Sequence, residues 1–257
     1  MRTSFATISK QGARSNNEDY LLVMDSPEAK RLTGIVCDGM GGHSCGEVAS
    51  LTVCNCIAHY WEQHTALPDS PEKVLEACRE ASAAMDRKAA EEGIAEMGTT
   101  LVMASIEADS VTIAHVGDSR CYVQRPGDGL IYQTEDHKVN VNGRQMLARC
   151  FFAGHPEAAR PDIKSIRLQA GDRILLCSDG LYGAIGRGIL LGKMMDSKPL
   201  EKILDEYDKM CERDGKDNLL GHPDRTGVSS APSPHTHRHI IFYPSDDIIC
   251  EVLTSIT

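Results

Sequence analysis

The sequence predicts an α+β fold in which two mainly antiparallel sheets pack face to face between outer helices. Two observations support this prediction. Nine short runs rich in apolar and β-branched residues recur along the chain, each bounded by Gly, Pro, Asp or Asn, as is typical of strands. Longer stretches with helical periodicity interrupt this series, and such helices would cover the outer faces of the sheets.

The expected strands share this boundary pattern. They are Thr3–Ser9, Tyr20–Met24, Leu32–Cys37, Thr99–Glu107, Val111–Val116, Arg120–Gln124, Ile163–Leu168, Arg173–Cys177 and Ile248–Leu253. Helices are expected at Gly46–His64 and Pro71–Glu92, the second with a proline in its first turn. A third helical region follows Gly183, and a fourth runs from Pro199 to Arg213.

The length and composition predict a single domain over residues 1–257. At 257 residues with 41% hydrophobic content, the chain can bury one sizeable core. Residues 221–239 contain three prolines and four histidines with little apolar periodicity, so we expect a surface loop or insertion there. The alternating His235, His237 and His239 are more typical of a solvated surface than of a metal site.

The charge and the cysteines restrict the partners and the compartment. The net charge of −10 argues against nucleic acid, whose binding proteins present basic faces, and fits an acidic cleft filled by cations. The ten cysteines contain no CxxC pair and the N-terminus does not resemble a signal peptide, so a cytoplasmic location is expected. No apolar run reaches the roughly 18 residues of a membrane span. No pattern indicates an oligomeric state.

Acidic residues recur at the ends of the expected strands. Asp38, Asp118 and Asp179 each follow such a run, and Glu18-Asp19 directly precedes one. Carboxylates gathered at one sheet edge would repel each other and raise each other's pKa unless cations lay among them. Ligands that are all oxygen atoms favour Mg²⁺ or Mn²⁺ over zinc. Each Asp alone could equally be a turn or cap residue, so their joint order carries the hypothesis.

Seven motifs follow one another in a specific order. They are Gly12-Ala13-Arg14-Ser15-Asn16-Asn17-Glu18-Asp19, Asp38-Gly39-Met40-Gly41-Gly42-His43 with Gly46-Glu47-Val48-Ala49-Ser50, Gly98-Thr99-Thr100, Val116-Gly117-Asp118-Ser119-Arg120, Glu135-Asp136-His137, Ser178-Asp179-Gly180-Leu181 and Asp217-Asn218. In this order they resemble the metal-dependent protein serine/threonine phosphatase family, type 2C, in its bacterial type. The resemblance reaches to about residue 218 and implies a four-layer α-β-β-α sandwich.

The resemblance also implies a metal site and its partners. Two Mn²⁺ or Mg²⁺ ions would be bridged by Asp38, and Asp118 would join Asp179 in holding a third, weaker ion. The implied ligands are Asp19, Asp38, the Gly39 carbonyl, Asp118, Asp179 and Asp217, with Glu18 acting directly or through metal-bound water. Arg14 would clamp the phosphate, because its planar fork suits two phosphate oxygens. Phosphoproteins would be the substrates and a serine/threonine kinase a partner.

The expected chemistry follows from charge. A phosphomonoester dianion repels hydroxide, so the enzyme must supply both positive charge and a nucleophile at neutral pH. Two close cations do both, because a water that bridges them loses its proton far below its bulk pKa and attacks phosphorus in line. We therefore expect Asp38 and Arg14 to be the catalytic residues. No cysteine or serine of the chain stands in a recognisable activating arrangement.

The chain departs from the family pattern beside the site. Met40 stands where some members have a histidine that protonates the leaving group, which leaves His43 as a candidate acid. Only 23 residues, Lys138–Arg160, lie between His137 and Pro161, so we expect a shortened flap. Residues 143–154 would be its remnant, with Arg144 and Arg149 able to face substrate.

The C-terminal ligand has two candidates. Asp217-Asn218 follows its expected helix at the usual distance but does not lead into a strand, whereas Asp246-Asp247 does. We favour Asp217 and keep Asp246 as the alternative.

Two other functions compete with a protein phosphatase. A phosphatase-like module could bind phosphoproteins without hydrolysing them, and a related enzyme could act on a small-molecule phosphate. The survival of Asp19, Asp38, Asp118 and Asp179 together favours a catalytic protein phosphatase.

Overall fold

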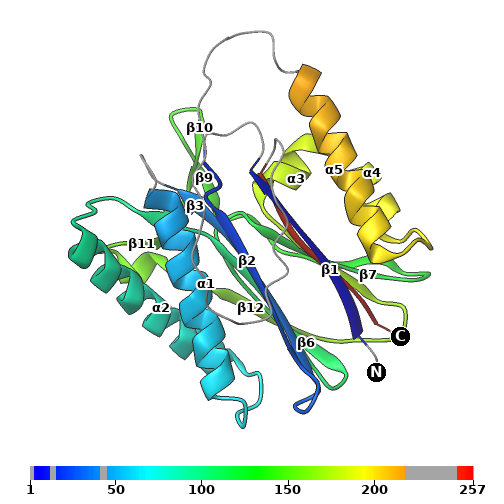
Figure 1. The fold of residues 1–257 in the computed structure, drawn as a ribbon, viewed down its shortest axis with the longest axis horizontal. Coiled ribbons are helices and arrows are strands. Elements are labelled where there is room, and N and C mark those ends of the chain that lie inside the picture. Colours follow the sequence, from blue (N-terminus) through cyan, green and yellow to red (C-terminus); the bar gives the residue numbers. More distant parts are fainter. Residues whose placement is uncertain (1–2, 12–15, 41–44, 218–247, 257) are drawn as a thin grey trace, which may run out of the picture.

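The computed structural model describes residues 3–11, 16–40, 45–217 and 248–256, and within these it describes only the backbone of residues 213–217, 248–253 and 255. Figure 1 shows two sheets packed against each other, with helices on both outer faces. The predicted α-β-β-α sandwich is therefore confirmed. The expected loop at residues 221–239 lies outside the described residues.

The first sheet has seven strands. Its order is β11-β4-β3-β5-β6-β12, and β2 pairs with β3 beside this path. The bounds are β2 (Asp19–Ser26), β3 (Arg31–Met40), β4 (Gly98–Thr99), β5 (Leu101–Glu107), β6 (Ser110–Val116), β11 (Phe151–Phe152) and β12 (Asp162–Arg167). Strand β3 is buried along most of its length, which fits its apolar sequence at the centre of the sheet.

The second sheet has five strands in the order β1-β14-β13-β7-β8. Their bounds are β1 (Thr3–Gln11), β7 (Arg120–Arg125), β8 (Gly129–Gln133), β13 (Arg173–Cys177) and β14 (Ile248–Ile256). A separate hairpin is formed by β9 (Lys138–Val141) and β10 (Arg144–Leu147). Every strand pair among the described residues is antiparallel, as predicted.

The helices divide between the two outer faces. Helices α1 (Cys45–Gln63) and α2 (Pro71–Glu92) cover the first sheet, and α3 (Asp179–Ala184), α4 (Arg187–Met194) and α5 (Leu200–Asp217) cover the second (Figure 1). A short 3₁₀ helix spans Pro156–Ala158. Helix α2 begins after Ser70, whose hydroxyl accepts from the Lys73 amide at 3.3 Å, and ends before Gly93 at φ 67°.

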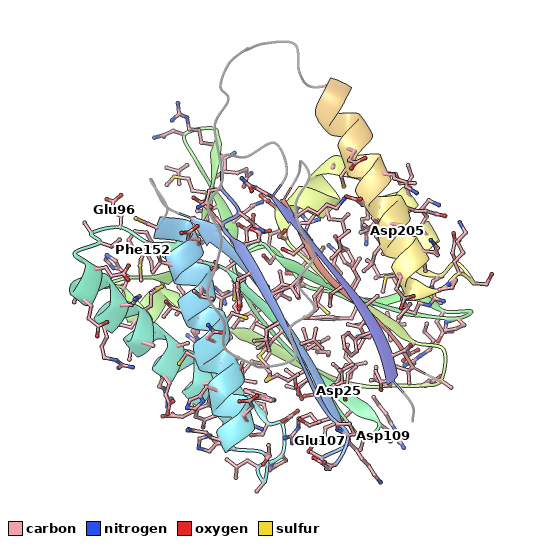
Figure 2. All side chains as sticks on the ribbon, viewed as in Figure 1. Asp25, Glu96, Glu107, Asp109, Phe152 and Asp205 are labelled. Carbon is pink, nitrogen blue, oxygen red and sulfur yellow. The ribbon has the colours of Figure 1, made fainter. Side chains whose placement is uncertain are left out.

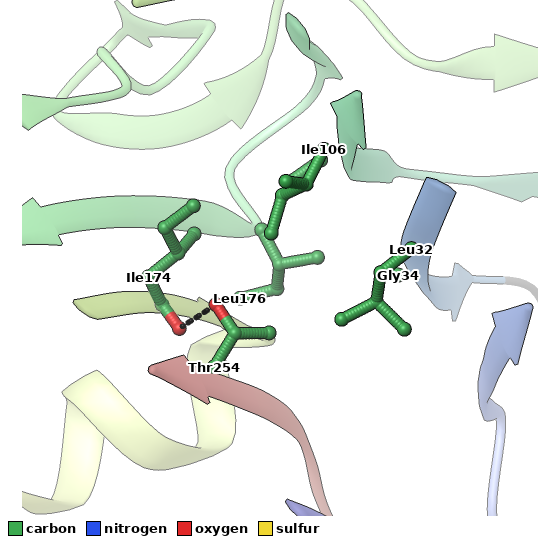
Figure 3. A pocket seen from close by; sticks show the side chains of 7 residues that line it. Leu32, Gly34, Ile106, Ile174, Leu176 and Thr254 are labelled. Atoms are coloured by element: carbon green, nitrogen blue, oxygen red, sulfur yellow. Dashed lines mark hydrogen bonds between the residues drawn. The ribbon is translucent and has the colours of Figure 1, made fainter. Parts of the chain in front are cut away.

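Three apolar clusters form the core. One lies between α1–α2 and the first sheet, one between α3–α5 and the second sheet, and one between the two sheets. Figure 3 shows the apolar hollow between the sheets, where the Thr254 hydroxyl donates to the Ile174 carbonyl at 3.5 Å. Leu32, Ile106 and Leu176 also line it. This hollow belongs to the apolar core between the sheets.

Candidate active site

Asp19 and Asp38 face each other across two neighbouring strands. The antiparallel register of β2 and β3 pairs these two residues directly, and their side chains share a hydrogen bond. Burial, followed by the negative charges of Asp19, Asp179 and Asp118, raises the pKa of Asp38 well above its ordinary value. The fold therefore brings all four strand-end carboxylates into electrostatic contact.

The backbone of Asp38 is fixed by the Gly98-Thr99-Thr100 motif. The amide of Thr100 donates to the Asp38 carbonyl at 2.9 Å, and the Asp38 amide donates to the Thr100 hydroxyl at 3.0 Å. The Thr99 hydroxyl also donates to the Asp38 carbonyl, at 2.9 Å. A 2.7 Å hydrogen bond then joins the hydroxyls of Thr100 and Ser119. This motif thus ties Asp38 to the turn that carries Asp118.

Two glycines allow the chain to pack tightly behind Asp38. The Gly39 amide donates to the Glu18 carbonyl at 3.0 Å. A Cβ atom on Gly39 would lie 2.2 Å from the Gly46 carbonyl oxygen, and one on Gly46 would lie 2.7 Å from Oε2 of Glu18. Only glycine fits at both positions, and the carboxyl group of Glu18 is thereby placed against the first turn of α1.

Asp118 lies in the turn between β6 and β7 and is only 6% exposed. Gly117 before it has φ 108°, which favours glycine, and its amide donates to Nδ1 of His137 at 3.1 Å. The His137 amide returns a 2.9 Å hydrogen bond to the Gly117 carbonyl. The hydroxyl of Tyr182 donates to the Asp118 carbonyl at 3.1 Å. His137 and Tyr182 therefore hold this turn in place.

His137 belongs to a group of three possible metal ligands. Its ligand atom and those of His115 and Asp162 lie within 4.8 Å of one another. Because Nδ1 of His137 accepts from Gly117, its Nε2 carries the proton and donates to Asp162 at 3.1 Å. A metal on Nε2 would displace that proton onto Nδ1, opposite the Gly117 amide. These contacts fit a hydrogen-bonded support for the Asp118 turn better than a metal site.

Lys138 and Arg120 place positive charge beside Asp118. The Lys138 ammonium lies 2.6 Å from Oδ2 of Asp118, and Arg120 binds Asp136 through two hydrogen bonds of 2.7 and 2.8 Å. The Arg120 guanidinium also stacks on the Tyr182 ring, 3.5 Å from its centroid. Neither Lys138 nor Tyr182 belongs to a metal-ligand pattern, so the sequence alone does not indicate their place beside Asp118.

The remaining predicted residues fall into two groups. Asp179 is the first residue of α3 and is exposed; it follows β13, whose last residue pairs with Arg120 at the start of β7. Asp217 is the last residue of α5, and only its backbone is described. Arg14, His43 and Asp246 lie outside the described residues.

The segment of the expected flap contains a hairpin and an ion pair. The segment after His137 forms the β9–β10 hairpin, with Arg144 exposed beside its turn. Arg149, the other arginine expected to be able to face substrate, binds Oδ1 of Asp162 at 2.7 Å at the start of β12. Among the described residues, no helix has the length and apolar character needed to span a membrane.

Comparisons with known proteins agree with this arrangement. A family model described as Protein phosphatase 2C matches residues 9–221. The serine/threonine phosphatase stp of Listeria innocua is 29% identical over 234 residues, covering 80% of this chain and 88% of that protein.

Solved structures of bacterial phosphatases share the fold. Stp1 from Staphylococcus aureus superposes with a TM-score of 0.77 at 22% identity, covering 100% of this chain and 96% of that one. The catalytic domain of PstP in complex with two manganese ions gives a TM-score of 0.72 at 23% identity, covering 99% and 98%. Since the family model spans most of the chain, this protein belongs to the protein phosphatase 2C family of phosphoprotein phosphatases.

Proposed function

We propose that this protein hydrolyses phosphoserine and phosphothreonine in protein substrates with two Mn²⁺ or Mg²⁺ ions held around Asp38. The observation that carries the proposal is the direct pairing of Asp38 with Asp19 at a buried sheet end. Burial and neighbouring carboxylates raise the pKa of Asp38 in the metal-free protein. A bound cation would replace the proton that Asp38 holds and balance the negative charge of these carboxylates. All-oxygen ligands suit hard divalent cations.

The proposed ligands follow the motifs in sequence order. They are Asp19, Asp38, the Gly39 carbonyl, Asp179 and Asp217, with Glu18 acting directly or through water; Asp118 is the position at which the family resemblance implies a third, weaker ion. When bound, the two cations would neutralise the phosphate and lower the pKa of a water molecule between them. Arg14 would orient the phosphate through its planar fork.

The chain's own residues would keep these groups in place. Thr99 and Thr100 fix the backbone of Asp38 and so the point from which its side chain extends. Tyr182 and His137 hold the Asp118 turn. Such fixed positions reduce the reorganisation needed during the reaction.

Asp217 and Asp246 remain alternatives for the last ligand. Helix α5 runs toward the end of the sandwich where β9 and β10 lie (Figure 1), and Lys10 near the end of β1 binds Asp208 of this helix at 2.5 Å. Asp246 stands two residues before the first residue of β14. Mn²⁺ titration of Asp217→Ala and Asp246→Ala distinguishes them, because only the true ligand's loss weakens metal binding. If neither variant is affected, both assignments fail.

The biological setting is also part of the proposal. We expect phosphoprotein substrates and a serine/threonine kinase that the phosphatase opposes in a signalling pathway, in the cytoplasm. The names of the bacterial relatives support the substrate class. Among the described residues, the free thiols of Cys54, Cys56, Cys78, Cys121 and Cys150 support a reducing compartment.

One assay separates the three candidate functions. Phosphate release is measured from a phosphoserine and phosphothreonine peptide panel and from p-nitrophenyl phosphate, with Mn²⁺ and with EDTA. A protein phosphatase hydrolyses the peptides only with Mn²⁺ and loses this activity in Asp38→Ala, while Asp25→Ala, on the same sheet at the other end (Figure 2), retains it. Peptide binding without turnover indicates a binding module. Turnover of p-nitrophenyl phosphate alone indicates a small-molecule phosphatase.

A further inference from the structure

Asp118 already has a positive partner within the chain. The Lys138 ammonium lies 2.6 Å from Oδ2 of Asp118; the Asp118 side chain is buried, at 9% exposure, and that of Lys138 is partly buried, at 29%. The Tyr182 hydroxyl lies 3.4 Å from the same oxygen. The Asp118 carboxylate thus has a cation in place, with the Tyr182 hydroxyl close beside it.

The position of Lys138 is set by its surroundings. Its amide donates to the Asp136 carbonyl at 2.9 Å, and its ammonium lies 3.8 Å from Oδ2 of Asp136. Asp136 is itself bound by both arms of Arg120, which stacks on Tyr182. A row of alternating charges, from Arg120 through Asp136 and Lys138 to Asp118, therefore fixes the ammonium against Asp118. A mobile surface lysine would lack these constraints.

This arrangement conflicts with a metal ion at Asp118. A divalent cation on that carboxylate would lie within a few ångströms of the ammonium, and the two positive charges would repel each other. Asp19 and Asp38 come from the first sheet and pair with each other across β2 and β3. At Asp118 the chain itself supplies a positive charge through Lys138.

We infer that Lys138 is a built-in cation at Asp118, so that a third metal ion binds there only by displacing it. This inference rests on the proposed metal-dependent function. It assigns Lys138 as a residue that limits the metal content of the site to two ions. It also implies that a third ion would break the contact between Asp118 and the base of the β9–β10 hairpin.

The test is Mn²⁺ stoichiometry, measured by calorimetry and by electron paramagnetic resonance of free Mn²⁺. The native chain is expected to bind two ions, and Lys138→Met to gain a third site or to tighten its weakest site on the order of tenfold. Lys138→Arg should behave as the native chain, and Lys138→Met with Asp118→Asn should lose the gain. Lys198→Met, which removes an ion-paired surface lysine, is the matched control.

The outcomes separate the two proposals. A third Mn²⁺ bound equally well by the native chain and Lys138→Met would overturn the inference, as would a gain that persists without Asp118. A native chain that binds no Mn²⁺ would instead overturn the proposed function. Circular dichroism checks folding, and Lys138→Gln replaces the methionine variant if that variant is unfolded.

Discussion

The pairing of Asp38 with Asp19 concentrates negative charge that the folded chain must balance. Without metal, the two carboxyl groups share a hydrogen bond and Asp38 holds its proton to higher pH, mainly because it is desolvated and secondly because Asp19 lies opposite. A bound cation would replace that proton. Metal affinity should therefore fall as the pH is lowered.

The first prediction concerns Asp38 in the metal-free protein. Because the folded pKa is raised, the folded state keeps a proton that the unfolded state has lost, so stability falls as pH rises from the ordinary Asp value through the folded one. Asp38→Asn has no carboxyl group to ionise at this position, so it avoids this loss of stability. It should stabilise the metal-free protein by about 1–3 kcal/mol at neutral pH. Thermal unfolding in EDTA at several pH values measures it.

The control for this variant is Asp25→Asn, an exposed carboxylate further along β2. It should leave the pH dependence of unfolding as it is in the native chain. If the stability of Asp38→Asn depends on pH in the same way as that of the native chain, Asp38 does not destabilise the metal-free protein.

The second prediction concerns Gly39. A methyl group there would overlap the carbonyl oxygens of Gly46 and Glu18, at 2.2 and 2.4 Å, and both belong to the backbone and cannot move aside. Gly39→Ala should therefore lower the free energy of unfolding by at least about 2 kcal/mol. Gly192→Ala in α4 meets no atom within 4 Å and should be neutral or slightly stabilising. Urea titrations that place the two variants at equal stability would contradict this packing.

Part of the site was predictable from single residues. Asp19, Asp38, Asp118 and Asp179 stand at strand ends, where short apolar runs give the strand and the following glycine or turn gives its end. Lys138 could not be assigned in this way, because its partner Asp118 is 20 residues away and only the tertiary fold brings the two together. The contact between Arg149 and Asp162 was unpredictable for the same reason, since the sequence does not reveal that the two residues lie side by side.

At the scale of elements, the β9–β10 hairpin lies beside the site and was not predicted from the apolar pattern of the sequence. Its two-residue turn places Asn142 at φ 53° and Gly143 at φ 82°, the backbone that Asn-Gly favours in hairpins. That dipeptide was a usable signal. The strands are only four residues each, too short for periodicity to identify.

The hairpin exposes an apolar face. Val139 and Met146 pair across its strands at 45% and 54% exposure, and Val141 is 44% exposed. Because Lys138 anchors this hairpin beside Asp118, its apolar face is placed to contact the peptide around a phosphorylated residue. Substrate selection by the short flap is therefore our third prediction.

Val139→Thr with Met146→Ser should lower kcat/KM for phosphopeptides by about fivefold, an apolar contact loss of roughly 1 kcal/mol. The rate with p-nitrophenyl phosphate should stay unchanged, since that substrate has no peptide to contact the hairpin. Ile189→Ser, at an exposed apolar position of α4, is the matched control. Equal losses for both substrates would mean that the hairpin supports the site rather than selecting peptides.

The longer elements were predicted well. Helix α2 was placed at its observed bounds because Pro71 and Gly93 mark both ends. The helical region expected after Gly183 is present as α4, whereas the short helix α3 before it was not predicted, because the chain turns into α3 directly after the strand run ends at Cys177. Strand β8 was missed, since its five residues follow the polar turn around Asp128 and contain no strong alternation.

On the scale of the whole molecule, buried charges lie at both ends of the sandwich but differ in balance. At the end marked by Glu107 in Figure 2, Arg31 binds Asp69 and Glu107 at 3.3 and 2.5 Å, and Lys73 binds Asp69 at 3.0 Å. There the chain supplies its own cations. Around Asp38, neighbouring carboxylates instead add to the negative charge. Metal ions bound at the end that carries Asp38 should therefore raise the free energy of unfolding of the whole domain.

The fourth prediction is the size of this stabilisation. At free Mn²⁺ of about 100 times Kd, one bound ion adds about 2.7 kcal/mol to the free energy of unfolding. For a chain of this length that corresponds to a rise in Tm of roughly 5–10 °C. Differential scanning calorimetry measures it, EDTA should reverse it, and Asp38→Ala should abolish it. A Tm that does not depend on Mn²⁺ in the native chain would contradict the prediction.

The central claim is that carboxylates around Asp38 hold the two cations on which phosphate hydrolysis depends. Its most direct test measures bound Mn²⁺ and phosphate release from a phosphothreonine peptide in the same samples, as Mn²⁺ is added to EDTA-treated protein. We predict no release without metal, a rise that reaches its plateau near two ions per chain, and neither binding nor release in Asp38→Ala. Release that continues in EDTA, or full activity in Asp38→Ala, would contradict the claim.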